Sequence, residues 1–151
     1  MWPEFKGRDG CRTPMPWSAD APHAGFTTAD KPWLPVADTH TALAVDRQLD
    51  QPDSLLTHFT QLLHWRREQP ALQHGSLALL PPHEQVLGFV REHGNQRLLC
   101  LFNFSERPAT LVLPNDWAAE GILPGSGLSG ARIDNGSVCF EPWGGLFLQA
   151  R

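Results

Sequence analysis

The sequence predicts a mainly β protein, an antiparallel sandwich or barrel preceded by an irregular segment and one α-helix. From Gly75 to the C-terminus, short apolar runs alternate with turn residues, and no helical pattern separates them. Residues 53–69 instead repeat apolar side chains at a helical period. The first fifty residues keep neither period and hold six of the 14 prolines, which exclude long helices and central strands there.

Composition limits the classes of protein to which this chain can belong. Its 151 residues suffice for one domain and an appendage. The net charge of −4 argues against a nucleic-acid binder, which normally carries a basic surplus. The longest apolar runs, LALL and LLCLF, are far shorter than the ~20 residues of a membrane helix. No secretory signal is recognisable, and we expect no nucleic-acid partner, no membrane contact and no cofactor.

The three cysteines are Cys11, Cys100 and Cys139, which are widely spaced and form no C-x-x-C motif. Without a secretory signal, this odd number favours reduced thiols and a cytoplasmic location. A Cys100–Cys139 disulfide is the less favoured alternative, because both residues lie in predicted strands.

The irregular first segment carries large aromatic side chains, which a solvated linker would lack. They are Trp2, Phe5, Trp17, Phe26 and Trp33. Side chains of this size need an apolar surface to cover them. The hundred residues that follow offer little such surface, so we expect a part of the protein outside this sequence to supply it.

The helix is expected at about residues 53–69, with Asp53 or Ser54 as its N-cap and Pro70 after its end. One face carries Leu55, Leu56, Phe59, Leu62 and Leu63. The expected strands are Ser76–Leu80, Gln85–Arg91, Arg97–Phe104, Ala109–Leu113, Ala119–Leu123, Ala131–Ile133, Ser137–Phe140 and Leu146–Gln149. Among the turns between them, Asp134-Asn135-Gly136 is the strongest hairpin signal, because Asn and Gly tolerate positive φ.

Several short motifs are better explained without a function. Residues 125–130 match G-x-G-x-x-G, but a hairpin-like segment follows where a dinucleotide site needs a helix, so we expect a flexible loop. Asn103 and Asn135 lie in glycosylation sequons that mean little without a secretory signal. The seven histidines lack metal-ligand spacing, so no metal site is expected. No nucleophile motif or assignable pair of catalytic carboxylates is present.

The segment Gly7–Trp17, GRDGCRTPMPW, has the clearest chemical character. Two arginines, Arg8 and Arg12, stand four residues apart with Asp9 between them. The planar guanidinium of Arg8 can bind a carboxylate or vicinal hydroxyls through two hydrogen bonds. From composition alone, an exposed Arg8–Asp9 ion pair of little energetic value is the favoured alternative.

This segment resembles the one after the eighth barrel strand in α-glucosidases and oligo-1,6-glucosidases of the α-amylase family, whose pattern is roughly G-R-D-N-x-R-T-P-M-x-W. The resemblance continues through residues 24–27 (AGFT), 52–56 (PDSLL), 63–67 (LHWRR) and 98–105, ending in FNFS. It implies that residues 1–70 are the loop and last helix of a (β/α)8 barrel, and that residues 71–151 form an antiparallel Greek-key β-sandwich.

The resemblance also implies a function for the intact protein, namely a retaining α-glucosidase acting on terminal α-linked glucose of oligosaccharides or glucosides. The catalytic acids of the family lie in earlier barrel strands, so this chain alone is expected to be inactive and to contribute no catalytic residue. Arg8 matches the arginine that lines the pocket for the terminal glucose. Arg12 matches one that lies nearer the aglycone or supports the loop, whereas Asp9 looks structural.

The chain departs from the family pattern at four positions of this segment. Gly10, Cys11, Pro16 and Ser18 stand where Asn, Ala, Gln and Asp are common. Gly10 and Pro16 change backbone freedom, so the path of the loop on the leaving-group side is open. An alternative to the enzyme is a stand-alone β-sandwich module that binds carbohydrate through an exposed tryptophan such as Trp117 or Trp143, or that stabilises a partner.

Overall fold

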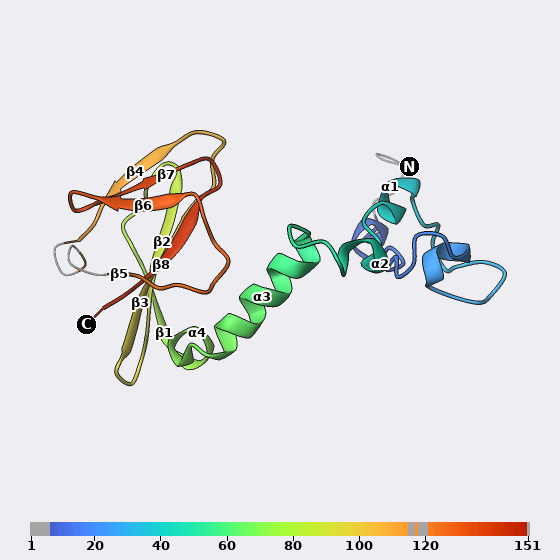
Figure 1. Ribbon diagram of the computed structural model, residues 1–151, viewed down its shortest axis with the longest axis horizontal. Helices are drawn as coiled ribbons and strands as arrows, with labels where there is room; N and C mark the ends of the chain where they lie inside the picture. Colours follow the sequence, from blue (N-terminus) through green and yellow to red (C-terminus); the bar gives the residue numbers. More distant parts are fainter. Residues whose placement is uncertain (1–6, 115–116, 118–120, 151) are drawn as a thin grey trace. The chain divides into compact units, whose positions relative to one another are not determined.

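The computed structural model describes residues 7–114, 117 and 121–150, and its backbone divides into two compact units (Figure 1). The first unit is Met1–Thr60 and the second is Gln61–Arg151. Trp2 and Phe5, whose burial the sequence raised as a question, lie outside the described residues. The domain boundary expected between residues 70 and 71 stays a prediction.

The second unit contains two antiparallel sheets, stacked as a sandwich (Figure 1). The five-stranded sheet has the order β1 (Ser76–Leu79), β2 (Val86–His93), β3 (Gln96–Asn103), β8 (Gly145–Gln149) and β5 (Gly121–Ile122). The three-stranded sheet has the order β4 (Ala109–Val112), β7 (Ser137–Phe140) and β6 (Ala131–Asp134). The chain changes sheets after β3, β4, β5 and β7, so the mainly β, antiparallel sandwich expected from the sequence is confirmed.

The main core lies between these two sheets and follows the alternation of the strands. Leu99 and Leu101 of β3 point into it, together with Leu148 of β8, and all three are fully buried. Val138 and Phe140 of β7 meet them from the other sheet. Alternate side chains of one strand share a face, so Leu98, Cys100 and Phe102 point to the opposite side of the five-stranded sheet.

That opposite face is covered in part by two helices, α3 (Leu55–Arg67) and α4 (Pro70–His74). Trp65, at the end of α3, is 6% exposed and lies with its ring centroid 4.6 Å from that of Phe147. Its indole N–H donates to the Pro124 carbonyl at 2.8 Å. Ala71 and Leu72 of α4 pack beside it over Leu98 and Cys100.

The predicted helix is confirmed with shorter bounds, and its cap is Ser54. The Ser54 hydroxyl accepts a hydrogen bond from the Thr57 backbone N–H at 3.1 Å, as an N-cap side chain does. Pro70 was expected only to follow the helix, but it also begins α4. Proline suits the first position of a helix, where its missing N–H has no helical partner. No helix among the described residues has the length and apolar character to cross a membrane.

Turn chemistry places the strands close to their expected bounds. Asn135 and Gly136 both have positive φ, 45° and 76°, and join β6 to β7 as the predicted two-residue hairpin. Residues 119–120 of the expected strand at 119–123, and Asn115-Asp116 of an expected turn, lie outside the described residues. Residues 125–130 form a loop that is followed by β6, and not by the helix that a dinucleotide site requires.

The glycines of this loop bring its backbone against α3. Gly125 and Gly127 have φ of 92° and 77°, and a Cβ atom added to either would lie 3.0–3.2 Å from the side chain of Trp65 or Gln61. The Gln61 side-chain amide also donates to the Gly125 carbonyl at 3.4 Å. The loop therefore packs closely against the end of α3. This contact accounts for the glycines of the motif without a phosphate ligand.

Two alternatives considered from the sequence are wrong. Trp117 is 1% exposed and belongs to the main core, with the Arg97 guanidinium 4.6 Å from its ring centroid, so it is not a surface tryptophan. Cys100 and Cys139 form no disulfide, because they lie on the two outer faces of the sandwich, one on each sheet. Both are free cysteines, as is Cys11. Burial raises the pKa of the Cys100 thiol to about 12, which makes it unreactive near neutral pH.

We expect Trp65→Ala to lower the free energy of unfolding of the second unit by about 3–5 kcal/mol, because it removes a buried ring and its hydrogen bond. Trp65→Phe keeps the aromatic packing but leaves the Pro124 carbonyl without its donor, so we expect a loss of about 1–2 kcal/mol. Urea unfolding followed by circular dichroism measures both. A loss below about 1 kcal/mol for Trp65→Ala would contradict the packing of α3 on the sheet.

Candidate functional site

Arg8 and Arg12 flank a single 3₁₀ turn, η1 (Asp9–Cys11). The Cys11 N–H donates to the Arg8 carbonyl at 3.1 Å, and the Arg12 N–H donates to the Asp9 carbonyl at 3.0 Å. These bonds fix the backbone on which both arginine side chains stand. Both residues are exposed.

In the part of the chain that the structure describes, neither guanidinium has a hydrogen-bond or ion-pair partner. The Arg8–Asp9 ion pair that composition favoured is therefore not formed. Asp9 instead contributes its backbone carbonyl to the turn. The side-chain donors of Arg8 and Arg12 are therefore not used within the described residues.

The segment after this turn is held by backbone hydrogen bonds. Pro14 is fully buried, and the carbonyls of Pro16 and Trp17 accept from the N–H groups of Val45 and Asp46 at 3.0 and 3.1 Å. Val45 begins a single helical turn, α2 (Val45–Gln48). Residues at the start of α2, which are far along the chain, thus anchor the segment that carries Arg8 and Arg12. We call this segment, residues 7–19, the arginine-bearing loop.

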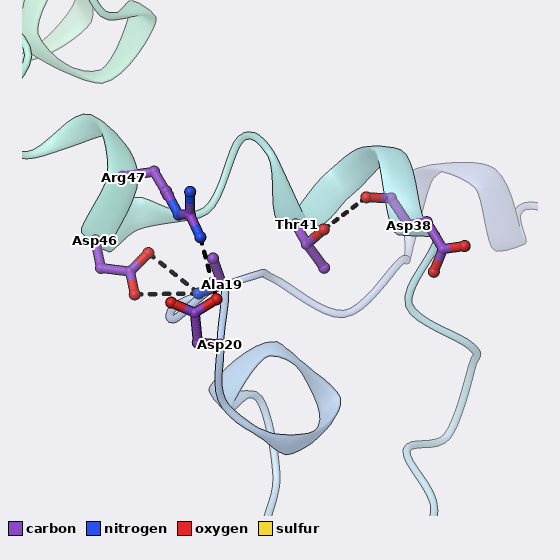
Figure 2. A network of polar contacts seen from close by, with 6 residues as sticks. All are labelled: Ala19, Asp20, Asp38, Thr41, Asp46 and Arg47. Carbon is purple, nitrogen blue, oxygen red and sulfur yellow. Dashed lines mark hydrogen bonds and ion pairs between the residues drawn. The ribbon is translucent and has the colours of Figure 1, made fainter.

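Asp46 adds a side-chain anchor to the same loop, as Figure 2 shows. Both of its carboxylate oxygens accept from the Ala19 N–H, at 3.0 and 3.1 Å. A hydrogen bond from the Ser18 side chain, supported by the Ala19 N–H, lowers the pKa of the Asp46 carboxyl. Next to it, Arg47 and Asp20 form an ion pair at 3.1 Å whose side chains are 56% and 89% exposed, so it contributes little to stability.

The return of this loop uses unusual backbone conformations. It passes through η2 (Pro22–Gly25), in which His23, Ala24 and Gly25 have φ of 52°, 52° and 70°. The Ala24 carbonyl accepts from the N–H groups of Trp17 and Ser18 at 2.8 and 3.0 Å. Ala24 is also buried, so the strained turn is held by its surroundings.

The large apolar side chains of this segment are largely uncovered. Trp17 is 53% exposed, Trp33 60% and Met15 46%. The same is true of one stripe of α3, where Leu55 is 78% exposed and Phe59 is 57% exposed. The described residues do not provide the surface that the sequence requires for these side chains.

Other chemistry-bearing residues form no centre. His74 and His93 have ring centroids 5.7 Å apart, a pair that spacing in the sequence does not reveal because β2 brings them together. Among the described residues, no three His, Cys, Asp or Glu side chains are grouped to hold a metal ion. Asn103 of the first sequon is 2% exposed, and its amide donates to the carbonyls of Arg107 and Glu141. Its role in the fold is therefore to join two loops.

Two known domain families match successive parts of the chain. Residues 2–75 match the alpha amylase catalytic domain, and residues 77–126 match the maltogenic amylase C-terminal domain. The junction between the two matches falls beside the start of β1 at Ser76.

Curated relatives match over most of the chain. A probable alpha-glucosidase of Rhizobium meliloti is 41% identical over 147 residues, which are 97% of this chain and 26% of the relative. The probable oligo-1,6-glucosidase 2 of Bacillus subtilis is 36% identical over 140 residues, 91% of this chain and 24% of the relative. The chain therefore spans about a quarter of the length of these relatives.

Solved structures of similar proteins have the same fold. The alpha-glucosyl transfer enzyme XgtA superposes with a TM-score of 0.88 at 44% identity, covering 100% of this chain and 28% of that protein. Isomaltulose synthase from Erwinia rhapontici superposes with a TM-score of 0.79 at 26% identity, covering 95% of this chain and 26% of that protein.

The fold and these similarities define a class of proteins in which the end of an amylase-type catalytic domain is followed by a β-sandwich. Within it, the chain matches domain families of the α-amylase type and is similar over most of its length to part of a probable alpha-glucosidase and of a probable oligo-1,6-glucosidase.

We expect protonation of Asp46 to release the arginine-bearing loop. Because its pKa is lowered in the folded chain, Asp46 contributes stability above its ordinary titration range and loses that contribution as pH falls below about 4. Hydrogen exchange should show less protection of the Ala19 amide at pH 3 than at pH 6, after correction for the intrinsic rate.

Asp46→Ala should abolish this pH dependence and leave the Ala19 amide weakly protected at both pH values. Asp50→Ala is the matched control, since Asp50 is an exposed acid close to Asp46 in sequence. Equal protection of Ala19 in the Asp46→Ala variant and the unsubstituted chain would contradict the anchoring role.

Proposed function

We propose that this chain is the C-terminal part of a retaining α-glucosidase that removes terminal α-linked glucose from small oligosaccharides or glucosides. The observation that carries the proposal is the match to a probable alpha-glucosidase over 97% of the chain. The two successive domain-family matches, over residues 2–75 and 77–126, support a division into a barrel part, residues 1–70, and a C-terminal sandwich domain, residues 71–151. The reduced cysteines support a cytoplasmic location.

In this proposal Arg8 binds hydroxyls of the terminal glucose and pairs with a carboxylate from an earlier barrel strand. Its exposed, unpaired guanidinium in the described residues suits that role, because a planar group with five donors can contact two oxygens together. Arg12, on the other side of η1, is assigned to the aglycone side or to support of the loop. The anchors at Pro16, Trp17 and Ala19 keep the turn in place.

Retention of configuration needs a nucleophilic carboxylate and an acid/base carboxylate about 5–5.5 Å apart. We assign neither to this chain and place both in the barrel strands that precede it. The contribution of the present residues to catalysis is therefore the positioning of substrate, with Arg8 as the contacting side chain.

A second candidate is a stand-alone module that binds carbohydrate by stacking. With Trp117 buried, it depends on Trp143, which is 67% exposed and has a positive φ of 60°. The two proposals differ in what the chain alone can do. A module binds maltose or isomaltose by itself through Trp143, whereas an enzyme part acquires its ligand only with the barrel.

We expect the 151-residue chain to release no aryl group from an aryl α-glucoside, because the catalytic acids are contributed by the barrel. The matched experiment joins the chain to the first three quarters of the Rhizobium meliloti relative, in place of the homologous last quarter. This grafted enzyme should release the aryl group, as the intact relative does. Heat-sensitive turnover by the chain alone would overturn the proposal, and so would a folded but inactive graft.

In the grafted enzyme, Arg8→Ala should lower kcat/KM by about 30- to 1000-fold, equivalent to about 2–4 kcal/mol for a buried charge-assisted contact. Arg132→Ala is the matched control, because Arg132 is an exposed arginine on β6 of the sandwich and should leave kcat/KM unchanged. An unchanged value for Arg8→Ala would remove Arg8 from the substrate site.

A further inference from the structure

The side chain of His83 holds the start of β2. Its ring nitrogen Nδ1 accepts hydrogen bonds from the backbone N–H groups of Gln85 at 3.2 Å and Val86 at 3.1 Å. Asparagine and aspartate make the same contact in turns, where a side-chain oxygen accepts from N–H groups a few residues further on. Only a ring nitrogen without a proton can accept, so these contacts require the neutral imidazole with its proton on Nε2.

Both N–H groups belong to residues that join β2 to the rest of the sandwich. Val86 is the first residue of β2, is 5% exposed and belongs to the main core. The Gln85 carbonyl accepts from the Phe104 N–H at 2.9 Å, and the Gln85 side-chain amide donates to the Ser105 hydroxyl at 3.1 Å. His83 therefore fixes two residues whose contacts extend into the core and to the residues that follow β3.

Ser105 extends these contacts to two further turns. Its hydroxyl also accepts from the Arg107 N–H at 3.0 Å, within the turn that joins β3 to β4. Its carbonyl accepts from the Trp143 N–H at 3.1 Å, in the turn that joins β7 to β8. Hydrogen bonds that begin at His83 thus connect the turns at residues 80–85, 104–108 and 141–144. We call them the three connected turns.

Four further charged side chains belong to these turns. Glu84 is on the first, Glu106 and Arg107 are on the second, and Glu141 is on the third. All four are exposed, and the first three line one hollow of ≈ 570 Å³. Among the described residues, none of them forms an ion pair with His83. Carboxyl groups in peptides titrate at about pH 4 and imidazole at about pH 6.5, so between about pH 5.5 and 7.5 the ring is the group whose charge changes.

We propose that protonation of His83 releases the three connected turns, so that this end of the sandwich responds to pH. A proton on Nδ1 replaces the acceptor lone pair with a donor that points at two other donors, the N–H groups of Gln85 and Val86. The imidazolium has no acceptor to offer, so the ring must turn away from the backbone. Both N–H groups then lose their partner, and Gln85 is no longer held where it binds Ser105.

Hydrogen exchange of the 151-residue chain tests this at single amides. Between about pH 7.5 and 5.5, after correction for the intrinsic rate, the protection of the Gln85 and Val86 amides should fall about tenfold or more, since each loses a hydrogen bond. The Trp143 amide should lose protection over the same range. The amides of Leu99 and Leu101, in the main core between the sheets, should keep theirs.

Three variants separate His83 from other causes. His83→Asn keeps an acceptor in nearly the same place on a side chain that does not titrate, so the Gln85 and Val86 amides should stay protected at both pH values. His83→Ala removes the acceptor, so both amides should be weakly protected at both pH values. His93→Asn is the matched control, because His93 is an exposed histidine at the other end of β2, in ring contact with His74. It should keep the pH dependence of the unsubstituted chain.

The protonation of the ring is measured in the unsubstituted chain, so this part of the test needs no variant to fold. Nitrogen NMR of the His83 imidazole should show a proton on Nε2 and none on Nδ1 at about pH 7.5, and a proton on both at about pH 5.5. A proton on Nδ1 at the higher pH would show that the ring is not the acceptor and would overturn the proposal.

Three exchange results also count against it. Equal protection of the Gln85 and Val86 amides at the two pH values would mean that the ring does not hold them. A pH dependence that persists in His83→Asn would assign the effect to another group. Unchanged protection of the Trp143 amide would show that the turns are not released together.

Discussion

Burial of both faces of the five-stranded sheet is the constraint on which the second unit depends. Leu99 and Leu101 fill the space between the sheets, while Leu98 and Cys100 of the same strand need a second cover. Trp65 supplies it through its ring contact with Phe147 and its hydrogen bond to the Pro124 carbonyl. Because a strand with both faces apolar cannot be stable with one face in water, the helix is part of the sandwich's core.

The first unit buries its apolar side chains less completely than the second. Its loop is specified by backbone hydrogen bonds and by the Asp46 carboxylate, which fix the turn that carries Arg8 and Arg12. Its large side chains remain in solvent, with Trp33 at 60% exposure. Hydrogen bonding can thus determine the path of a loop whose apolar side chains find their cover elsewhere. The arginines on this loop are therefore positioned by its backbone.

Local signals made the strands and the main helix predictable, because turns and caps depend on neighbouring residues. Asn135-Gly136 defines a hairpin by its own φ preferences, and Ser54 caps a helix three residues ahead of the N–H that it binds. Pro70 was ambiguous, since proline both follows one helix and begins another. The burial of Trp117 depends on its contact with Arg97 and on the opposite sheet, and such distant contacts leave no periodic signal. Arg8 and Arg12 were found through their motif, whereas the anchor between Asp46 and Ala19 joins residues 27 positions apart.

The departures from the family pattern in the arginine loop are compatible with its geometry. A Cβ atom at Gly10 would have no neighbour within 4 Å, so the turn does not require glycine there and would also accept the more common asparagine. Pro16 has no N–H, but the loop uses its carbonyl, which accepts from Val45. Ser18, where aspartate is common, donates to Asp46, a contact in which a second carboxylate would repel the first. These residues are thus compatible with the backbone that carries Arg8.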